Sequence, residues 1–561
     1  MSTDEDISLR KSDPNPLLAR ASLWFVAFGV ALRMIRYLQN YPLWCDESML
    51  AANLLDRRWT DLALPLDYHQ VCPLGFLAMA WAAVRGLGFS EMSLRLVPIL
   101  SATASVPLFF LLARRMLGAG MVASLLAVGL FAVAQPPIRF AAEFKPYATD
   151  LLVATGLLLL ALKWRAAPER PRWLLALAIA APVALSVSLP SVFLLAPIAV
   201  VGFFEIVARR RWGLLPAYAA FLGMTAAGGI AMAAIGQYHT TAGDRAYFLK
   251  FWSQGFPPSW RDPAALVHWL ARVHTGPLFA YPHGPSTFPS WLNTIVFACF
   301  VVGVAVRFRR DPGEVALLVL PFLFAFAASV VRRYPYGVSP RVSQFLLPST
   351  LLLVAAGVDP LIERLRDAPL RRWAVPGLVG LLVAFGSWRL ASGFVHPYRT
   401  LGDRTAREFA RWFWEELGVD AELVCVQNDL GIPFRPERWS YNGADQYLSY
   451  QRIYSERHRK GLPPRWDAIS PSRPLRCVLL NRLPAEVPRF VAWMEANQYA
   501  LRDVRIYPAF RGTRDEPRQI YVVCELVSLS RTVARSEERG GKSLATLTAT
   551  SSPSAPKATR R

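Results

Sequence analysis

The sequence predicts a polytopic α-helical membrane protein that carries a small α/β domain near its C-terminus. Of the 561 residues, 53% are hydrophobic and 18% are charged, which is too apolar for an ordinary soluble enzyme of this length. Many apolar runs approach the roughly 20 residues that a helix needs to cross a bilayer. Arginine clusters separate these runs, and the composition turns polar only after about residue 392.

Eleven apolar segments are predicted to be transmembrane helices. The first, 21–38, follows a polar segment, 1–20, that we expect to be a cytoplasmic tail. It carries Arg33 and Arg36 near its far end, where a buried charge costs about 2.5 kcal/mol or more, so both need partners. We expect Asp46 and Glu47 to be these partners. The other ten segments are 94–112, 121–134, 151–163, 173–188, 192–208, 214–235, 291–306, 315–331, 345–358 and 373–390.

The formal net charge of +22 is distributed as the positive-inside rule requires. Arginine lies between apolar runs, so we predict a lipid bilayer as the partner of this charge and no nucleic acid. With the N-terminal tail inside, one side holds the basic loops 114–115, 163–172, 209–211, 307–310 and 364–372. Loop 332–341 is the exception, because it is basic and falls outside. The arginine-rich, lysine-poor composition favours a bacterial inner membrane with a periplasmic outer face.

Two long outer segments, 41–93 and 236–290, interrupt the transmembrane domain of residues 21–391. In the first, 49–59 and 73–87 are predicted to be short amphipathic helices on the membrane surface. Residues 392–530 form the predicted extracytoplasmic α/β domain, and 531–561 a disordered basic tail. The expected elements of the α/β domain are helices 404–417 and 486–496 and strands 423–427, 475–480 and 520–526.

Asp46 and Glu47 follow directly on the first span and are the leading catalytic candidates. A general base must come within hydrogen-bond reach of the attacking hydroxyl or amine. A carboxylate at the membrane interface can meet a lipid-linked substrate that lies in the bilayer. The alternative is a solvated pair that only neutralises Arg33 and Arg36, and position alone leaves both interpretations open.

A second polar cluster follows the third span and contains Arg139, Glu143, Lys145, Tyr147 and Asp150. If the chain is helical after Pro146, Tyr147 and Asp150 share a face at i,i+3. Lys145 is a point charge suited to a phosphate. The alternative is a polar cap between two spans, but a short turn seldom needs two carboxylates and a lysine.

Arg332, Arg333 and Arg341 form the third cluster, in the basic outer loop. Guanidinium groups bind phosphate through paired hydrogen bonds and can stabilise the charge of a departing phosphate. The alternative is that they anchor two helix ends in lipid headgroups. His69 and Gln70 in the first outer segment are weaker substrate-binding candidates, because a lone histidine is more often structural.

The six cysteines form no CxxC pair and no zinc spacing. Cys45 and Cys72 lie on the oxidising side and could pair, as could two of Cys425, Cys477 and Cys524; the sequence leaves both open. The chain has no P-loop, no HExxH and no strand-linked GxGxxG. An enzyme of this kind therefore needs an activated substrate other than a soluble nucleotide bound at a Rossmann site.

Three motifs together resemble the GT-C glycosyltransferases. They are the Asp46-Glu47 pair after the first span, the Lys-Pro-Tyr-x-x-Asp stretch of residues 145–150, and the Arg-x-Tyr-Pro loop of residues 332–335. Over residues 20–391 the chain is most similar to glycosyltransferase family 39, the dolichyl-phosphate-mannose protein mannosyltransferases, and to bacterial relatives that use polyprenyl-phosphate sugars.

The resemblance implies eleven to thirteen spans, an inside N-terminus and an active site on the outer face. It implies transfer of a hexose or pentose from a polyprenyl-phosphate-linked donor, with inversion. It makes no cofactor certain, and whether a divalent metal is needed stays open. Asp46 is similar to the family's catalytic base, and Glu47 to the neighbour that positions substrate or charge. Lys145 and Arg341 would contact the lipid phosphate.

The acceptor stays open because the chain departs from the eukaryotic mannosyltransferases. Only about 55 residues lie between the seventh and eighth predicted spans, which leaves no room for that family's carbohydrate-binding repeat domain. A glycolipid, an envelope glycan and a protein all remain. Inverting transfer of a sugar from a good leaving group to an acceptor needs one base, whereas a glycosidase needs a paired acid and base.

Two other functions fit part of the pattern. A transporter or flippase of lipid-linked sugars would explain the spans, but it predicts inverted repeats and mid-span charges, and the sequence shows no repeat. An envelope polysaccharide ligase or polymerase would suit the long second outer segment. The Asp-Glu pair at the first membrane exit favours a simple transferase.

Overall fold

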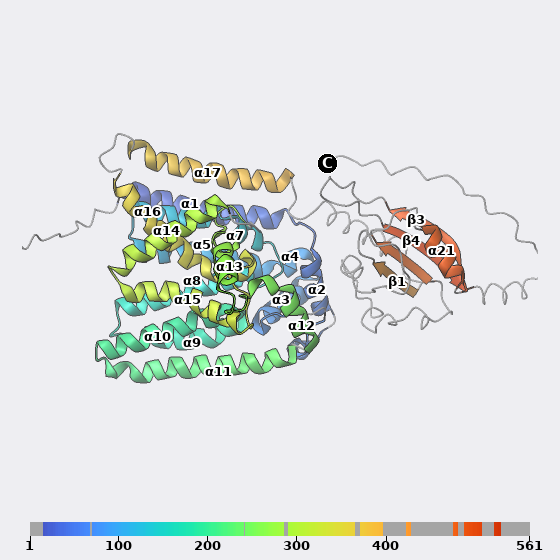
Figure 1. The fold of residues 1–561 in the computed structure, drawn as a ribbon, viewed down its shortest axis with the longest axis horizontal. Helices are drawn as coiled ribbons and strands as arrows, with labels where there is room; N and C mark the ends of the chain where they lie inside the picture. The colour runs from blue at the N-terminus through green and yellow to red at the C-terminus, as the bar shows by residue number, and fades with distance from the viewer. Residues whose placement is uncertain are drawn as a thin grey trace, which may run out of the picture. The chain divides into compact units, whose positions relative to one another are not determined.

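The computed structural model describes most of the helical region and the central parts of the C-terminal unit. The described residues are 15–55, 57–67, 70–239, 242–284, 290–364, 371–395, 422–427, 475–480, 487–496, 498–507 and 521–528. They belong to two compact units, one made of helices up to Val395 and the other built on a β-sheet (Figure 1).

The described residues contain nine helices long and apolar enough to cross a membrane, which makes the chain an integral membrane protein. They are α1 (Pro16–Leu38), α5 (Leu96–Leu117), α8 (Tyr147–Ala166), α10 (Val192–Ala208), α11 (Leu215–His239), α14 (Trp291–Phe308), α15 (Pro312–Val330), α16 (Leu347–Arg364) and α17 (Arg371–Val395). Two shorter helices, α6 (Val122–Val133) and α9 (Arg172–Val187), occupy the other two predicted spans. All eleven predicted segments are therefore helical.

Several helices extend beyond the predicted apolar segments. Helix α5 continues through Arg114 and Arg115, because arginine is a good helix former and its charged end can reach the interface. Helix α1 begins at Pro16, inside the predicted tail. The Asn15 side chain accepts a hydrogen bond from Leu17 N at 2.9 Å, and proline is suited to the first helical position.

The first helix holds its two arginines differently from the prediction. Arg33 does not pair with Asp46 or Glu47; it is fully buried, and its guanidinium donates to the carbonyls of Phe131 and Ala132, both at 3.1 Å. The backbone amide that would donate to the Ala132 carbonyl belongs to Pro136 and has no hydrogen. Arg33 thus supplies hydrogen-bond donors to backbone carbonyls at the C-terminal end of α6.

Arg36 also has a partner other than the predicted carboxylates. Its guanidinium carbon lies 3.8 Å from the centroid of the Tyr41 ring, a cation–π contact. The expectation that Asp46 and Glu47 neutralise these two arginines was therefore wrong.

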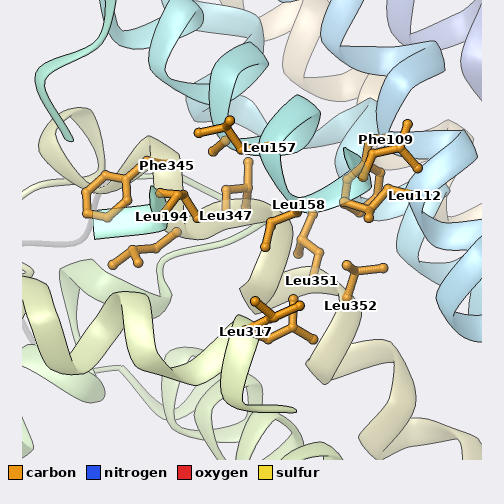
Figure 2. Close-up of a cluster of buried hydrophobic side chains, with 14 of the residues drawn as sticks. Phe109, Leu112, Leu157, Leu158, Leu194, Leu317, Phe345, Leu347, Leu351 and Leu352 are labelled. Carbon is orange, nitrogen blue, oxygen red and sulfur yellow. The ribbon is translucent and has the colours of Figure 1, made fainter. Parts of the chain in front are cut away.

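The core of the helical unit is built from leucine and phenylalanine side chains of α5, α8, α10, α15 and α16 (Figure 2). Helices α14 and α16 approach each other at Gly303 and Gly357. A Cβ atom on Gly303 would lie 1.8 Å from the Leu353 carbonyl oxygen, and one on Gly357 would lie 1.9 Å from the Cys299 carbonyl oxygen. Such contacts between small residues let membrane helices pack closely.

The basic helix ends meet at one end of the unit. Arg115 Nε donates to the Leu162 carbonyl at 3.3 Å, which joins the ends of α5 and α8. Arg165, at the end of α8, pairs with Glu205 of α10 and, at 2.8 Å, with Asp311 before α15. Several predicted inside loops therefore lie together.

Short helices occupy the connections at the opposite end. They are α2 (Cys45–Leu55), η1 (Trp59–Ala63), α3 (Leu74–Leu87), α4 (Glu91–Leu94), α7 (Gln135–Phe140), α12 (Ala242–Phe251), η4 (Ser253–Gly255), α13 (Pro263–His274), η5 (Pro277–Phe279) and η6 (Pro340–Leu346). In Figure 1, α2, α3, α4 and α12 gather at the same end of the long helices. The helix predicted at 73–87 is confirmed as α3, whereas the one predicted at 49–59 begins earlier, at Cys45, and ends at Leu55.

The second unit contains a four-stranded sheet in the order β1-β2-β4-β3. Strand β1 (Glu422–Gln427) pairs in parallel with β2 (Leu475–Leu480), and β4 (Tyr521–Ser528) runs antiparallel to both β2 and β3 (Tyr499–Tyr507). Helix α21 (Val487–Ala496) contributes Phe490 and Met494 to the buried cluster of this unit. The α/β prediction is thus confirmed, but β3 was missed. Predicted helix 404–417 and tail 531–561 lie outside the described residues.

Three of the cysteines considered for disulfides are free thiols. Cys72 is buried and free, so the possible pairing with Cys45 is not formed. Cys477 and Cys524 face each other in the register of β2 and β4, yet both are free.

Candidate active site

The Asp46-Glu47 pair lies in the first turn of α2, at the end of the bundle opposite to the basic loops. Pro42 follows the end of α1 and separates the two helices. Trp44 N donates to Glu47 Oε2 at 3.2 Å, so the third helical residue satisfies the backbone amide before the helix, as in one half of a capping box. Both carboxylates lie at the positive end of the α2 dipole.

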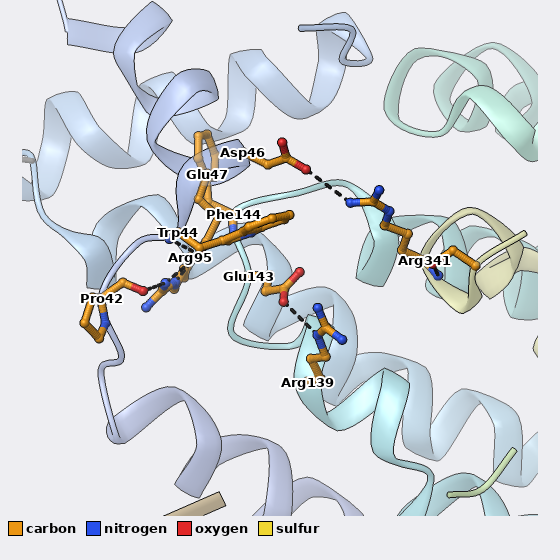
Figure 3. Close-up of polar contacts among 10 residues, drawn as sticks. Pro42, Trp44, Asp46, Glu47, Arg95, Arg139, Glu143, Phe144 and Arg341 are labelled. Atoms are coloured by element: carbon orange, nitrogen blue, oxygen red, sulfur yellow. Dashed lines mark hydrogen bonds and ion pairs between the residues drawn. The ribbon is translucent and has the colours of Figure 1, made fainter. Parts of the chain in front are cut away.

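Glu47 is buried in a network that uses both of its oxygens. Arg95 donates from Nε to Oε1 and from a terminal guanidinium nitrogen to Oε2, both at 2.9 Å. Phe144 N donates to Oε1 at 2.6 Å, as Figure 3 shows. Because the side chains of Glu47 and Arg95 are each 2% exposed, the pair is shielded from water. Glu47 therefore ties α2 to the start of α5 and to the loop before α8.

Arg95 completes this network through the backbone that precedes α2. It donates to the carbonyls of Tyr41 and, at 3.1 Å, Pro42. Burial lowers the pKa of the Arg95 guanidinium, but the charge and hydrogen bonds of Glu47 outweigh burial and leave the pKa raised. The segment that carries Asp46 is thus fixed from two sides.

Asp46 points away from this network and contacts Arg341 (Figure 3). Asp46 Oδ2 lies 3.2 Å from Arg341 Nη1, and the two side chains are 27% and 16% exposed. The Arg341 guanidinium carbon also lies 4.6 Å from the ring centroid of Trp252 and 5.6 Å from that of Phe251. Asp46 is therefore an accessible carboxylate beside a cation that aromatic rings hold in place.

Lys145 lies near the same carboxylate. Its Nζ donates to Gln70 Oε1 at 2.6 Å, and the lysine side chain is buried. Burial lowers the pKa of Lys145, while Asp46 is the strongest of the charges that raise it. Residues far apart in sequence, Asp46, Gln70, Lys145 and Arg341, thus converge in one site.

The rest of the second predicted cluster surrounds this site. Arg139 Nε donates to Glu143 Oε1 at 2.9 Å. Helix α8 begins at Tyr147, directly after Pro146, so the predicted i,i+3 relation of Tyr147 and Asp150 is confirmed. Both side chains lie at the start of α8, and Tyr147 packs edge-on against Phe140 at 5.0 Å between ring centroids.

The third predicted cluster is divided. Arg341 is the cation beside Asp46, whereas Arg332 lines a separate cavity together with residues of α12 and α13. Arg333 is exposed. His69 lies outside the described residues.

Sequence reasoning assigned no role to Arg95 or to the two aromatic residues beside Arg341. Arg95 is one arginine before an apolar run, and nothing in its local sequence distinguishes it from a helix-end anchor. Phe251 and Trp252 belong to a segment rich in aromatic residues, so composition alone could not single them out. Among the described residues, no three histidine, cysteine, aspartate or glutamate side chains are grouped so that they could hold a metal ion.

Solved structures with a similar arrangement of helices include two of ArnT from Cupriavidus metallidurans. The form bound to undecaprenyl phosphate matches with a TM-score of 0.51 and 14% identity, over 89% of this chain and 97% of that chain. The apo form gives the same TM-score and identity, over 90% and 98%. ArnT is a GT-C protein. The chain has the GT-C fold.

The comparisons support the GT-C fold without selecting a family within it, so the resemblance to family 39 is not confirmed at that level. The oligosaccharyltransferase of Archaeoglobus fulgidus, in complex with Zn and sulfate, matches at 13% identity with a TM-score of 0.41, over 77% of this chain and 61% of that chain. No protein-family model and no curated protein matches the sequence. In this GT-C chain, the converging residues lie on the short helices and loops that connect the membrane spans.

Proposed function

We propose that the protein is an integral membrane glycosyltransferase. It moves a hexose or pentose from a polyprenyl-phosphate-linked donor to an acceptor on the outer face of a bacterial inner membrane, with inversion. The observation that carries this proposal is the accessible Asp46 carboxylate, 3.2 Å from Arg341 and close to Lys145. A base and two phosphate-binding cations are the minimum set that such a transfer requires.

In the proposed reaction the acceptor oxygen attacks the anomeric carbon of the donor sugar. Asp46 takes the proton from the acceptor hydroxyl as the new carbon–oxygen bond forms. The bond between the anomeric carbon and the phosphate oxygen breaks, and its electron pair stays on the polyprenyl phosphate. Arg341 and Lys145 bind that phosphate, so the charge that develops on it is stabilised without a second carboxylic acid.

The donor class is supported by two observations. One ArnT structure with this fold is bound to undecaprenyl phosphate, a polyprenyl phosphate. In this chain the cations Arg341 and Lys145 lie near the interface end of the helices, where a lipid phosphate would be found. Gln70 holds Lys145 through the 2.6 Å hydrogen bond and would direct its charge toward the donor.

The other residues of the site have positioning or binding roles in this proposal. Glu47 positions the turn that carries Asp46, because its oxygens are occupied by Arg95 and by backbone amides. Glu143 orients Arg139 through their ion pair. Tyr147 and Asp150, at the start of α8, are proposed to contact the donor sugar.

The experiment that tests the function is sugar transfer with Asp46→Asn. Membranes that carry the wild-type chain or the variant are given a radiolabelled polyprenyl-phosphate sugar, and label in the acceptor fraction is measured. Because the variant keeps the shape of the side chain but removes the base, we expect transfer to fall by about 10²- to 10⁴-fold.

The matched control for this test is Asp67→Asn. Asp67 lies in the same outer segment, but its exposed carboxylate pairs with Arg57, away from Arg341. This variant should transfer at the wild-type rate. Unchanged transfer in Asp46→Asn would mean that Asp46 only neutralises Arg341, and transport of a lipid-linked sugar would then be the better function.

A further inference from the structure

A cavity of about 520 Å³ lies beside the site and takes no part in the proposed chemistry. It is lined by residues of α12, the η4 turn, α13 and the loop after α15 and is partly open to the outside. Its volume is within the range typical of small-molecule sites. None of the residues assigned to the base or to the donor phosphate lines it.

The cavity lining combines positive charge with an aromatic and proline wall. His268, Arg272 and Arg332 supply the basic groups, and no carboxylate lies among the described residues of the lining. The apolar wall includes Phe256, Pro257, Pro258 and Trp269. An anion with an apolar face would therefore be complementary to it.

The structure fixes several of these groups independently of a ligand. Trp269 Nε1 donates to the Gln254 carbonyl at 2.9 Å, and a terminal nitrogen of Arg272 approaches the same carbonyl at 3.4 Å. Tyr336 N donates to the Gly255 carbonyl at 2.8 Å, which attaches the loop after α15 to the η4 turn. The walls of the cavity are thus held together by hydrogen bonds to backbone carbonyls.

Arg332 occupies a backbone position that favours glycine. Its φ is +56°, and Arg333 N donates to the Ala328 carbonyl at 2.8 Å, the bond that closes a Schellman motif at the end of α15. A side chain in this left-handed conformation is strained. The position nevertheless carries an arginine, and that arginine lines the cavity.

The cavity adjoins the candidate base through α12. Phe251 and Trp252 contact the Arg341 guanidinium, and the next two residues, Ser253 and Gln254, line the cavity. One short segment therefore separates a ligand in the cavity from the ion pair of Arg341 with Asp46.

We propose that this cavity binds an acidic saccharide, a sugar that carries a carboxylate or a phosphate. Arginine pairs with either acid through charge-assisted hydrogen bonds. The aromatic and proline wall suits the apolar face of a sugar ring, and Ser253 and Gln254 offer groups for its hydroxyls. We assign the cavity as the acceptor subsite, and the acceptor is then an acidic glycan. This assignment rests on the proposed function.

The test measures binding, so that it does not depend on transfer. The full chain is reconstituted in phosphatidylcholine nanodiscs, and binding of radiolabelled trigalacturonate is compared with that of neutral maltotriose. We expect the acidic trisaccharide to bind at least tenfold more tightly. The variant R272A/R332A should weaken its binding at least tenfold, whereas R245A/R261A, which removes two exposed charges of the same outer segment that do not line the cavity, should leave it unchanged.

A second variant, Arg332→Gly, distinguishes a lost ligand contact from a folding defect. It removes one cation while giving the left-handed position the residue it favours, so weakened binding in this variant reports the ligand contact. Absence of trigalacturonate binding, equal binding of maltotriose, or full binding by R272A/R332A would overturn the proposal. Binding of dihexanoyl phosphatidylglycerol without trigalacturonate would also overturn it, in favour of a lipid-headgroup site.

Asp46→Asn separates this proposal from the proposed function. We expect that variant to lose transfer but to bind trigalacturonate as the wild type does. If it retains transfer, the transferase mechanism fails, and the binding measurement still decides whether the cavity takes an acidic saccharide.

Discussion

Adjacent carboxylates in this chain have opposite environments. The Asp46 side chain is 27% exposed with one ion-pair partner, whereas the Glu47 side chain is 2% exposed and accepts hydrogen bonds at both oxygens. The first turn of α2 explains the difference, because consecutive helical residues face directions about 100° apart. One carboxylate is thus available for chemistry, and the other holds the turn in place.

Glu47→Gln should therefore destabilise the protein. The substitution leaves Arg95 buried without a full countercharge, and removing one partner of a buried ion pair costs about 3 kcal/mol or more. Thermal unfolding of the detergent-purified chain measures this loss. Asp46→Asn is the comparison, because a partly exposed pair contributes about 1 kcal/mol or less. An equal melting temperature for Glu47→Gln and the wild type would contradict the positioning role.

His274 should make stability sensitive to acid. Its Nδ1 lies 2.8 Å from the Leu270 carbonyl and its Nε2 lies 3.2 Å from the Tyr336 hydroxyl, so the neutral ring donates at Nδ1 and accepts at Nε2. Burial lowers its pKa in the folded protein. The unfolded chain therefore binds this proton first, and the stability from neutral His274 is present above pH of about 6.5 and decreases as pH falls below it.

Unfolding measured at pH 7 and at pH 5 tests this expectation. His274→Gln removes the titrating group, so the pH dependence should be smaller than in the wild type. His268→Gln, at an exposed position of the same helix, should retain the wild-type dependence. Identical pH profiles for His274→Gln and the wild type would show that another group is responsible.

At the scale of elements, the sequence predicted the helices better than their ends. Hydrophobic runs located every long helix that the structure describes. Charged residues such as Arg114 and Arg115 interrupt these runs, so the predicted helices end before the last turns. The α2 helix was predicted four residues late, because its first turn contains the two carboxylates and its cap is made by Glu47 itself.

Strand β3 was missed because a register shift between Leu501 and Asp503 interrupts the alternation of side chains that identifies a strand. The site was predictable only in part, because some of its residues are conspicuous in the sequence and others are not. Asp46, Lys145 and Arg341 stand out as charges next to apolar runs, whereas Arg95, Phe251 and Trp252 acquire their roles only through contacts between distant segments.

The crossing of α14 and α16 gives a prediction for packing. Gly303→Ala places a methyl group where the Leu353 carbonyl oxygen lies 1.8 Å away, so the helices must separate. Overpacking of this kind costs about 1 to 3 kcal/mol. Gly223→Ala in α11 is the matched control, because a Cβ there meets no atom within 4 Å. Equal thermal stability of the two variants would contradict the close crossing.

At the scale of the whole molecule, the distribution of charge agrees with the location of the site. Arg115 and Arg165 join helix ends at one end of the bundle, next to exposed arginines such as Arg210 and Arg310. The candidate base and its cations lie among the connections at the other end. Because cytoplasmic loops are enriched in arginine and lysine, we expect the site to face the periplasm.

Cysteine labelling tests this orientation. In a chain whose six native cysteines are replaced by serine, Arg210→Cys and Ser259→Cys introduce single thiols at exposed positions of a basic loop and of the second outer segment. In spheroplasts, a membrane-impermeant maleimide should label the Ser259→Cys chain directly and the Arg210→Cys chain only after the membrane is opened. The reverse pattern would put the site in the cytoplasm. The basic loop 332–341 would then need no explanation by an anionic ligand, because it would lie on the side where positive loops are normal. Orientation and the role of Arg332 and Arg341 therefore depend on each other.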